Sequence, residues 1–190
     1  TSSSSTGIIS GITFSNKFNS INSLIKYWET NFESLKKETA LFTNTFYNTD
    51  LADSILESVS ANLSILKSPT LLRQSDGTLW CWEGCGDNEG FCPGSCTHVW
   101  NYAQAIPHLF PNLERSLRET AFIHSQNELG HQRFRAALPV GNATHDLLAA
   151  ADGQLGEIMQ VYRDWRISGD NDWLESIWSK VETCMNYCIK

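Results

Sequence analysis

A long helical pattern of apolar residues constrains the fold of this chain more than any other feature. Between residues 14 and 35 the apolar side chains recur in alternating steps of four and three, at Phe14, Phe18, Ile21, Ile25, Trp28, Phe32 and Leu35. This spacing places all of them on one face of an α-helix. We therefore expect a long amphipathic helix, which further apolar residues extend as far as Phe46.

Similar helical blocks follow along the 190 residues of the chain. A second helix is expected after Asp50, whose carboxylate can cap free N–H groups, and Pro69 should end it. Further helices are expected over residues 97–110, with a kink at Pro107, and over residues 111–121, 152–169 and 170–188. Four aromatic residues fall at helical spacing and are expected in the core: Trp100, Tyr102, Tyr162 and Trp165.

The connections between these helices are short, and no linker divides the chain. Two strands are expected at residues 70–73 and 78–82, on either side of a turn at Asp76 and Gly77. Residues 131–138 should form a strand or an extended link, and residues 1–13 are expected to be disordered. Paired helices joined in this way bury one face against the next pair. The predicted fold class is therefore all-α, with short β segments in the loops.

Charge and hydropathy narrow the classes of function. The formal net charge of −7 and the isoelectric point near 5.2 disfavour a nucleic-acid-binding surface, which is normally basic. No stretch approaches 18 consecutive apolar residues, so we expect no transmembrane segment. The sequence does not fix the compartment and favours the cytoplasm only slightly.

The stretch from Trp80 to Tyr102 is the strongest candidate for a functional loop. It holds four of the six cysteines and three of the seven tryptophans, which argues against disorder. Within it Glu83 lies between Trp82 and Gly84. A tryptophan ring offers a flat apolar face to a ligand and glycine lets the backbone approach it, so a functional role for Glu83 is favoured over that of an ordinary exposed loop carboxylate.

The cysteines allow a second interpretation of the same stretch. Four of them could bind one structural zinc ion tetrahedrally: Cys81, Cys85, Cys92 and Cys96. Disulfides and reduced packing thiols are at least as well supported by the spacing, and no other metal or cofactor is expected. Cys184 and Cys188 lie four apart on one face of the last helix and are most simply core residues.

Two ordered blocks of sequence resemble glycoside hydrolase family 116, which includes bile-acid β-glucosidases and glucosylceramidases. The first block runs from Gly84 to Ser116 and the second from Ala151 to Asp170. The run Cys-Thr-His-Val-Trp-Asn-Tyr at 96–102 is similar to the bacterial branch of the family. The resemblance implies an (α/α)6 toroid that hydrolyses β-glycosides with retention of configuration, using a Glu nucleophile and an Asp general acid/base.

The resemblance also implies roles for individual residues. Glu83 matches the nucleophile, and Glu89 is the reserve candidate. A sugar-contacting histidine falls on His145, and the remaining substrate-binding candidates are Thr97, His98, Trp82 and Asp152. Thr97 stands where glucosylceramide-cleaving members carry an Asp. A structural role remains open for each histidine, and helix capping remains open for Asp152.

The resemblance places the acid/base Asp beyond Lys190. We therefore expect residues 1–190 to form a single partial catalytic domain, inactive by itself, whose parent protein takes a glycoside substrate. The alternative is a non-catalytic helical module that binds carbohydrate or a protein partner, with its cysteine-rich loop held by zinc or disulfides.

Overall fold

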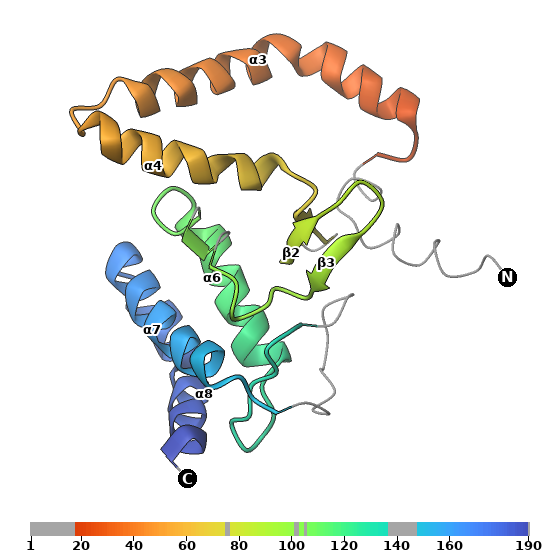
Figure 1. The fold of residues 1–190 in the computed structure, drawn as a ribbon. Helices are drawn as coiled ribbons and strands as arrows, with labels where there is room; N and C mark the ends of the chain where they lie inside the picture. The colour runs from red at the N-terminus through yellow and green to blue at the C-terminus, as the bar shows by residue number, and fades with distance from the viewer. Residues whose placement is uncertain (1–17, 75–76, 101–102, 105, 137–147, 190) are drawn as a thin grey trace, which may run out of the picture.

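The computed structural model describes residues 18–74, 77–100, 103–104, 106–136 and 148–189. Within these residues the chain is mostly helical, with five α-helices and one small three-stranded sheet (Figure 1). The prediction of a helical chain with short β segments is confirmed at this level. No helix in the described part is long and apolar enough to cross a membrane.

Helices α3 and α4 form an antiparallel pair at one end of the molecule (Figure 1). Helix α3 spans Ile21–Tyr47 and begins with a capping box, in which the Ser20 and Ser23 side chains each accept from the other's backbone N–H. Helix α4 spans Asp53–Leu63 and continues as a 3₁₀ turn over Ser64–Lys67. The predicted long helix is confirmed, although Phe14 lies outside the described residues.

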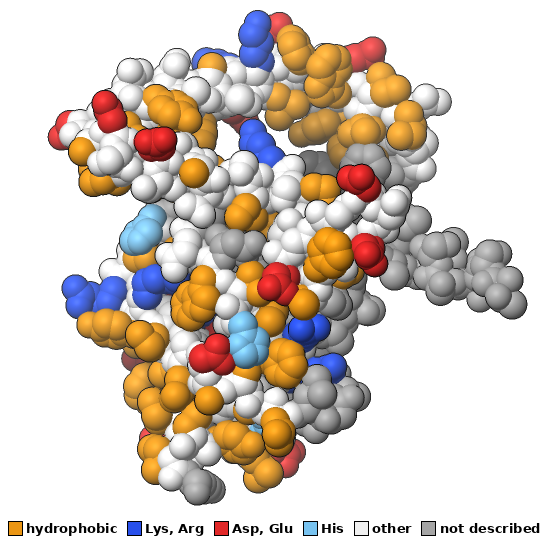
Figure 2. All heavy atoms as spheres, viewed as in Figure 1, with side chains coloured by type: hydrophobic (Ala, Val, Ile, Leu, Met, Phe, Trp, Pro, Cys, Tyr) orange, Lys and Arg blue, Asp and Glu red, His pale blue; other side chains and the backbone are white. Residues whose placement is uncertain are grey.

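No residue of α3 or α4 is buried. Trp28 of α3 is 53% exposed, and hydrophobic side chains cover much of this end of the molecule (Figure 2). The apolar residues therefore form one face of helix α3, but none of them is buried. The predicted Asp50 cap is wrong, because α4 is capped by Ala52 and has no side-chain cap.

A three-stranded antiparallel sheet follows α4. Strand β1 (Leu71–Arg73) pairs with β2 (Leu79–Cys85), and β2 pairs with β3 (Gly90–Pro93). The first hairpin confirms the two predicted strands, and Gly77 takes the positive φ of 92° that its turn requires. The second hairpin was not predicted. It converts the expected cysteine-rich loop into a strand pair closed by a hydrogen bond from Gly86 N to Glu89 O of 2.8 Å.

The predicted continuous helix over residues 97–110 is wrong. Thr97 and His98 form a turn, Ala103 and Gln104 are helical, and residues 106–109 form a bend and a second turn. The backbone N–H of Thr97 donates to Phe134 O at 3.0 Å, which ties the start of this segment to another part of the chain. Pro107 has no N–H to donate, so a helix could not pass through it without losing a bond.

Three helices form the body of the molecule. Helix α6 spans Pro111–Glu119 with proline in its first turn, as predicted, and a π-helical turn, Thr120–His124, continues it. Helix α7 spans Ala151–Ser168 and ends at Gly169, whose φ of 66° confirms the predicted stop. Helix α8 spans Asn171–Ile189, and Asp170 caps it by accepting from Trp173 N at 2.9 Å.

The core lies between these elements in two clusters of buried side chains. One cluster joins the sheet to α6 and contains Leu79, Cys81, Ala103, Ile106 and Leu117. The other joins α7 and α8 to the turn after α6 and contains Ala121, Phe122, Val161, Trp173, Ile177, Val181 and Cys184. Two predicted core aromatics are instead exposed: Trp100 by 40% and Tyr162 by 59%. Residues 131–136 form an extended link with one bridge, between Gln126 and Gln132.

Candidate functional site

The turn after β3 is held in place by backbone hydrogen bonds from two sides. Gly94 N and Ser95 N both donate to Cys81 O, at 3.2 and 2.8 Å, and Cys81 N donates to Ser95 Oγ at 3.1 Å. From the other side, Ala136 N donates to Gly94 O at 2.5 Å. Gly94 has a φ of 106°, and a Cβ added there would collide with Ala136 O, so only glycine fits.

This turn forms one wall of an open pocket of about 550 Å³. The lining side chains are Glu83, Cys96, His98, Val99, Trp100 and Arg135. Figure 2 shows acidic, basic and histidine side chains close together on the face of the molecule below β2 and β3. The pocket thus combines a carboxylate from β2, an imidazole and an indole from the segment after β3, and a guanidinium from the link at residues 131–136.

Glu83 is exposed on β2 and lines this pocket. It also interacts with Cys92 on β3: the hydrogen bond with Glu83 is the largest cause that raises the pKa of the Cys92 thiol, and Arg135 opposes it. Cys92 has a φ of 45°, which is uncommon for a residue with a side chain. Glu83, Cys92 and Arg135 therefore lie close together at one side of the pocket.

His98, which also lines the pocket, forms a pair with Asp152 at the start of α7. His98 Nδ1 lies 2.9 Å from Asp152 Oδ2, and the two side chains are 40% and 70% exposed. The hydrogen bond with His98 is the main cause that holds the pKa of Asp152 below its ordinary value. The His98 ring also meets Phe134 edge to face, with centroids 5.4 Å apart. Asp152 thus orients His98, and it does not cap α7, whose N-cap is Ala150.

The other predicted site residues lie elsewhere. Trp82 packs on Gly90, where an added Cβ would collide with its ring, and meets Trp80 edge to face at 4.8 Å, so it does not line the pocket. Thr97 is buried behind the wall, 7% exposed. Glu89 is exposed in the turn between β2 and β3, away from the pocket lining. His145 lies outside the described residues.

The cysteines do not form a metal site. All six are free thiols, and the described residues include no group of three or more His, Cys, Asp and Glu side chains placed to hold a metal ion. Cys81 and Cys85 lie four apart on a strand, about 13 Å, which is too far for one zinc ion. Cys81 is instead a core residue, and burial raises its pKa. Of the three states that the sequence left open for these cysteines, the structure has free thiols. Cys184 is buried as predicted, whereas Cys188 is exposed.

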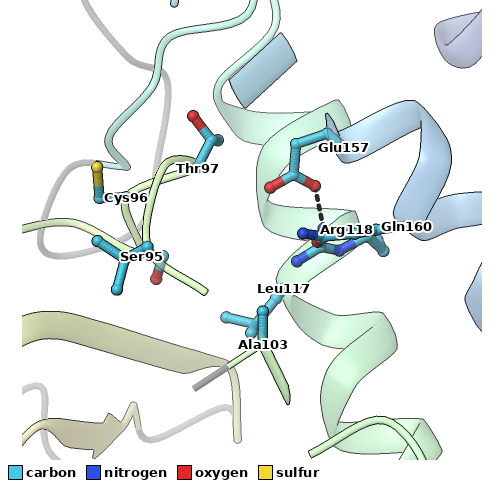
Figure 3. Close-up of a pocket in the computed structure, with 9 residues that line it drawn as sticks. Ser95, Cys96, Thr97, Ala103, Leu117, Arg118, Glu157 and Gln160 are labelled. Carbon is cyan, nitrogen blue, oxygen red and sulfur yellow. Dashed lines mark ion pairs between the residues drawn. The ribbon is translucent and has the colours of Figure 1, made fainter. Parts of the chain in front are cut away.

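Sequence reasoning missed a cluster of charged side chains buried between α6 and α7. Arg118 is 3% exposed and forms ion pairs with three buried carboxylates: Glu114 at 3.5 Å, Glu157 (Figure 3) and Asp164 at 3.8 Å. Arg163 adds bonds of 2.6 Å to Glu114 and 2.7 Å to Asp164. With all five groups ionised, three carboxylates face two arginines and the cluster carries one excess negative charge.

Burial sets the protonation of this cluster. It raises the pKa of Glu114 to about 7, because the two arginines only partly offset the loss of water. The pKa values of Glu157 and Asp164 are also raised, with burial as the largest cause. Burial alone would lower the pKa of Arg118, but the three carboxylates together raise it, so the guanidinium stays charged.

The open pocket is suited to binding a small polar ligand, and its Glu83 carboxylate could act on that ligand as a nucleophile or a base. The pocket is open, its indole offers an apolar face, and the His98–Asp152 pair offers a fixed donor or acceptor. No protein-family model and no curated protein sequence matches the chain. The assignment to a glycosidase family therefore stays a prediction from the residues quoted above.

Proposed function

We propose that this chain is part of a retaining β-glycosidase of the β-glucosidase type, with Glu83 as its nucleophile. The observation that supports this most is the pocket that gathers Glu83, His98 and Trp100 around one open space. Glu83 and His98 are separated by 15 positions in sequence and were selected independently of their position in space. A functional carboxylate needs such neighbours, whereas an ordinary surface carboxylate does not.

In this proposal a Glu83 carboxylate oxygen attacks the anomeric carbon of the bound glycoside. The bond from that carbon to the leaving oxygen breaks, and the leaving oxygen takes a proton from a general acid about 5 to 5.5 Å from the nucleophile. Water then attacks the glycosyl ester, gives up its proton to the same acid/base, and releases Glu83. His98, held by Asp152, binds a sugar hydroxyl, and Trp100 packs on the sugar ring.

The proposal assigns the acid/base to an Asp beyond residue 190. It also places α3 with α4 and α7 with α8 as two of the helix pairs of an (α/α)6 toroid. Support for this arrangement comes from the antiparallel course of both pairs and from the two-residue joint, Gly169 and Asp170, between α7 and α8. The isolated chain is expected to be inactive.

Turnover of an aryl β-glucoside by the longer parent protein tests this function. Glu83→Gln should lower kcat/KM by at least about 10³-fold, because the amide cannot form the covalent intermediate. Glu89→Gln is the matched control, since Glu89 lies six residues from Glu83 on the same hairpin but outside the pocket lining. Unchanged turnover in Glu83→Gln, or loss only in Glu89→Gln, would contradict the assignment.

A non-catalytic binding module is the second candidate, and the exposed face of α3 favours it. Ile21, Trp28 and Phe42 are 65%, 53% and 44% exposed on a helix with no buried residue. Patches of this kind mark surfaces that contact a partner or another part of a larger protein. A parent protein that binds methyl β-glucoside in an NMR titration but never hydrolyses an aryl β-glucoside would support this candidate over the first.

A further inference from the structure

Behind the wall of the candidate pocket lies a second, much smaller cavity (Figure 3). Cys96 and Val99 line both spaces, so they form the partition between them. The cavity leaves about 10 Å³ for the centre of a water molecule. That is room for one water and too little for any sugar.

The lining of this cavity is polar and buried. Figure 3 shows the Glu157 carboxylate and the Arg118 guanidinium on one side, and the turn from Ser95 to Thr97 on the other. Four polar side chains line it, each no more than 7% exposed: Thr97, Arg118, Glu157 and Gln160. An empty space of this size among such groups would be unusual, because dry cavities in proteins are apolar.

Two of these four side chains have a buried polar atom without a partner. Thr97 Oγ1 and Gln160 Oε1 have no hydrogen-bond partner. Arg118 Nη1 and Glu157 Oε2, which belong to the other two side chains, form an ion pair with each other. Buried polar atoms without partners are costly and rare, so two such atoms beside a buried ion pair at one cavity call for a further partner.

We propose that this cavity binds one ordered water molecule. The water accepts hydrogen bonds from the Arg118 guanidinium and the Thr97 hydroxyl, and it donates to the Glu157 carboxylate and the Gln160 carbonyl. This assignment uses both protons and both lone pairs of the water, and it matches the number of partners that buried waters usually have.

The bound water makes Thr97 a positioning residue for the pocket. Thr97 directly precedes His98, and its Oγ1 lies against Gly153, where an added Cβ would collide with it. Gly153 in turn directly follows Asp152. The water therefore fixes Thr97 to the buried charge cluster of α6 and α7 just behind the His98–Asp152 pair, whose Nδ1–Oδ2 distance is 2.9 Å.

Two isosteric substitutions at Ala103 test the water. Ala103 lines the cavity and is 2% exposed. Ala103→Val and Ala103→Thr fill the same volume and displace the water, but only threonine brings a hydroxyl in its place. The valine variant should have a lower Tm than both the threonine variant and the unchanged protein. A valine variant that is more stable than the unchanged protein, or equal Tm values for the two variants, would overturn the proposal.

A crystal structure of the full chain tests the site directly. One water peak should lie within hydrogen-bond distance of the Arg118, Glu157 and Gln160 side chains, and an empty cavity would overturn the proposal.

The positioning role of Thr97 has its own readout, the NMR titration of the Asp152 carboxyl carbon. Thr97→Val should raise the pKa of Asp152 towards its ordinary value, and Thr97→Ser should keep it low. An unchanged Asp152 titration in Thr97→Val would contradict the positioning role.

Discussion

The open pocket and the buried charge cluster both have a charged partner on helix α7, but the charges in the two regions obey different rules. Asp152 at the start of α7 reaches out to His98, with both side chains partly exposed to water. Glu157 and Asp164, further along the same helix, reach in to Arg118 and are almost fully buried. Exposed charges can exchange partners with water or a ligand at little cost, whereas buried charges must stay paired. The pocket is therefore suited to binding a ligand, whereas the cluster is suited to holding α6 and α7 together.

The two regions also differ in what can be removed without unfolding the protein. In the cluster each charged group compensates another, so one deletion leaves uncompensated buried charge. In the pocket, water can hydrogen-bond to the partner of a side chain that has been removed. The following substitutions separate the two regions by the size of their effect on stability.

Loss of Arg118 should have the largest effect. Arg118→Met keeps the apolar volume but leaves Glu114, Glu157 and Asp164 with Arg163 alone, so the free energy of unfolding should fall by about 3–5 kcal/mol in urea titrations. Arg166→Met is the control, because Arg166 lies on the exposed face of α7 and contacts only Tyr162 in the described hydrogen bonds and ring contacts. Equal losses for the two variants would show that the cluster has no special importance.

The cluster should also make stability depend on pH. Glu114 has an ordinary pKa of 4.5 and a folded-state pKa of about 7, so the folded protein keeps this proton to a higher pH than the unfolded chain. The free energy of unfolding should therefore fall as pH rises from about 4.5 to about 7, by up to about 3 kcal/mol. Arg118, Arg163, Asp164, Glu157 and Cys81 are the charged or titratable groups coupled to Glu114. Glu114→Gln should flatten this slope, and a slope unchanged in that variant would contradict the assignment.

Gly153→Ala should have an intermediate effect that joins the two regions. The new Cβ would collide with Thr97 Oγ1 and separate α7 from the turn that carries His98. Overpacking of this kind costs about 1–3 kcal/mol, and the pKa of Asp152 should rise as its contact with His98 is lost. Gly84→Ala is the matched control, since nothing lies within 4 Å of a Cβ at Gly84. A Gly153→Ala variant as stable as Gly84→Ala would contradict the close contact.

Loss of His98 should have the smallest effect on folding. His98→Gln removes the partner of an exposed carboxylate, so the urea midpoint at pH 7 should stay within error of the unchanged protein. The pKa of Asp152 is lowered in the folded state, so its contribution to stability is present at neutral pH and is lost as pH falls below its ordinary value of 3.8. The acid limb of the stability curve should therefore be the only part that changes. A large loss at neutral pH would place His98 with the buried cluster.

Much of the helical framework could be predicted from local chemistry. Pro111 at a helix start and Gly169 at a helix end act through their own backbone geometry, so the sequence was sufficient to place them. The predicted helix over residues 97–110 failed because apolar spacing says nothing about a long-range bond such as Thr97 N to Phe134 O. The β2–β3 hairpin was missed because β3 is short and contains Gly90 and Pro93, which both disfavour strands.

For the candidate site too, some features could be predicted from the sequence and others could not. Glu83 and His98 stood out by residue type in an unusual stretch, but their meeting at one pocket, with Arg135 from a distant link, depends on the tertiary fold. The buried cluster was missed because Glu114 and Arg118 have the i,i+4 spacing of an ordinary surface ion pair. A signal was present, since Glu114 and Arg118 share the helix face of Leu117 and Ala121, which were expected to be buried.

Covalent labelling of the parent protein tests the central claim, that Glu83 is the nucleophile of a retaining glycosidase, most directly. A 2-deoxy-2-fluoro-β-glucoside with a dinitrophenolate leaving group needs little help from an acid, so it reports on the nucleophile alone. Mass spectrometry of the digested protein should find the fluoroglucosyl group on the peptide that contains Glu83, and Glu83→Gln should abolish the label. A label on another carboxylate, or none in a protein that turns over the parent glucoside, would contradict the account.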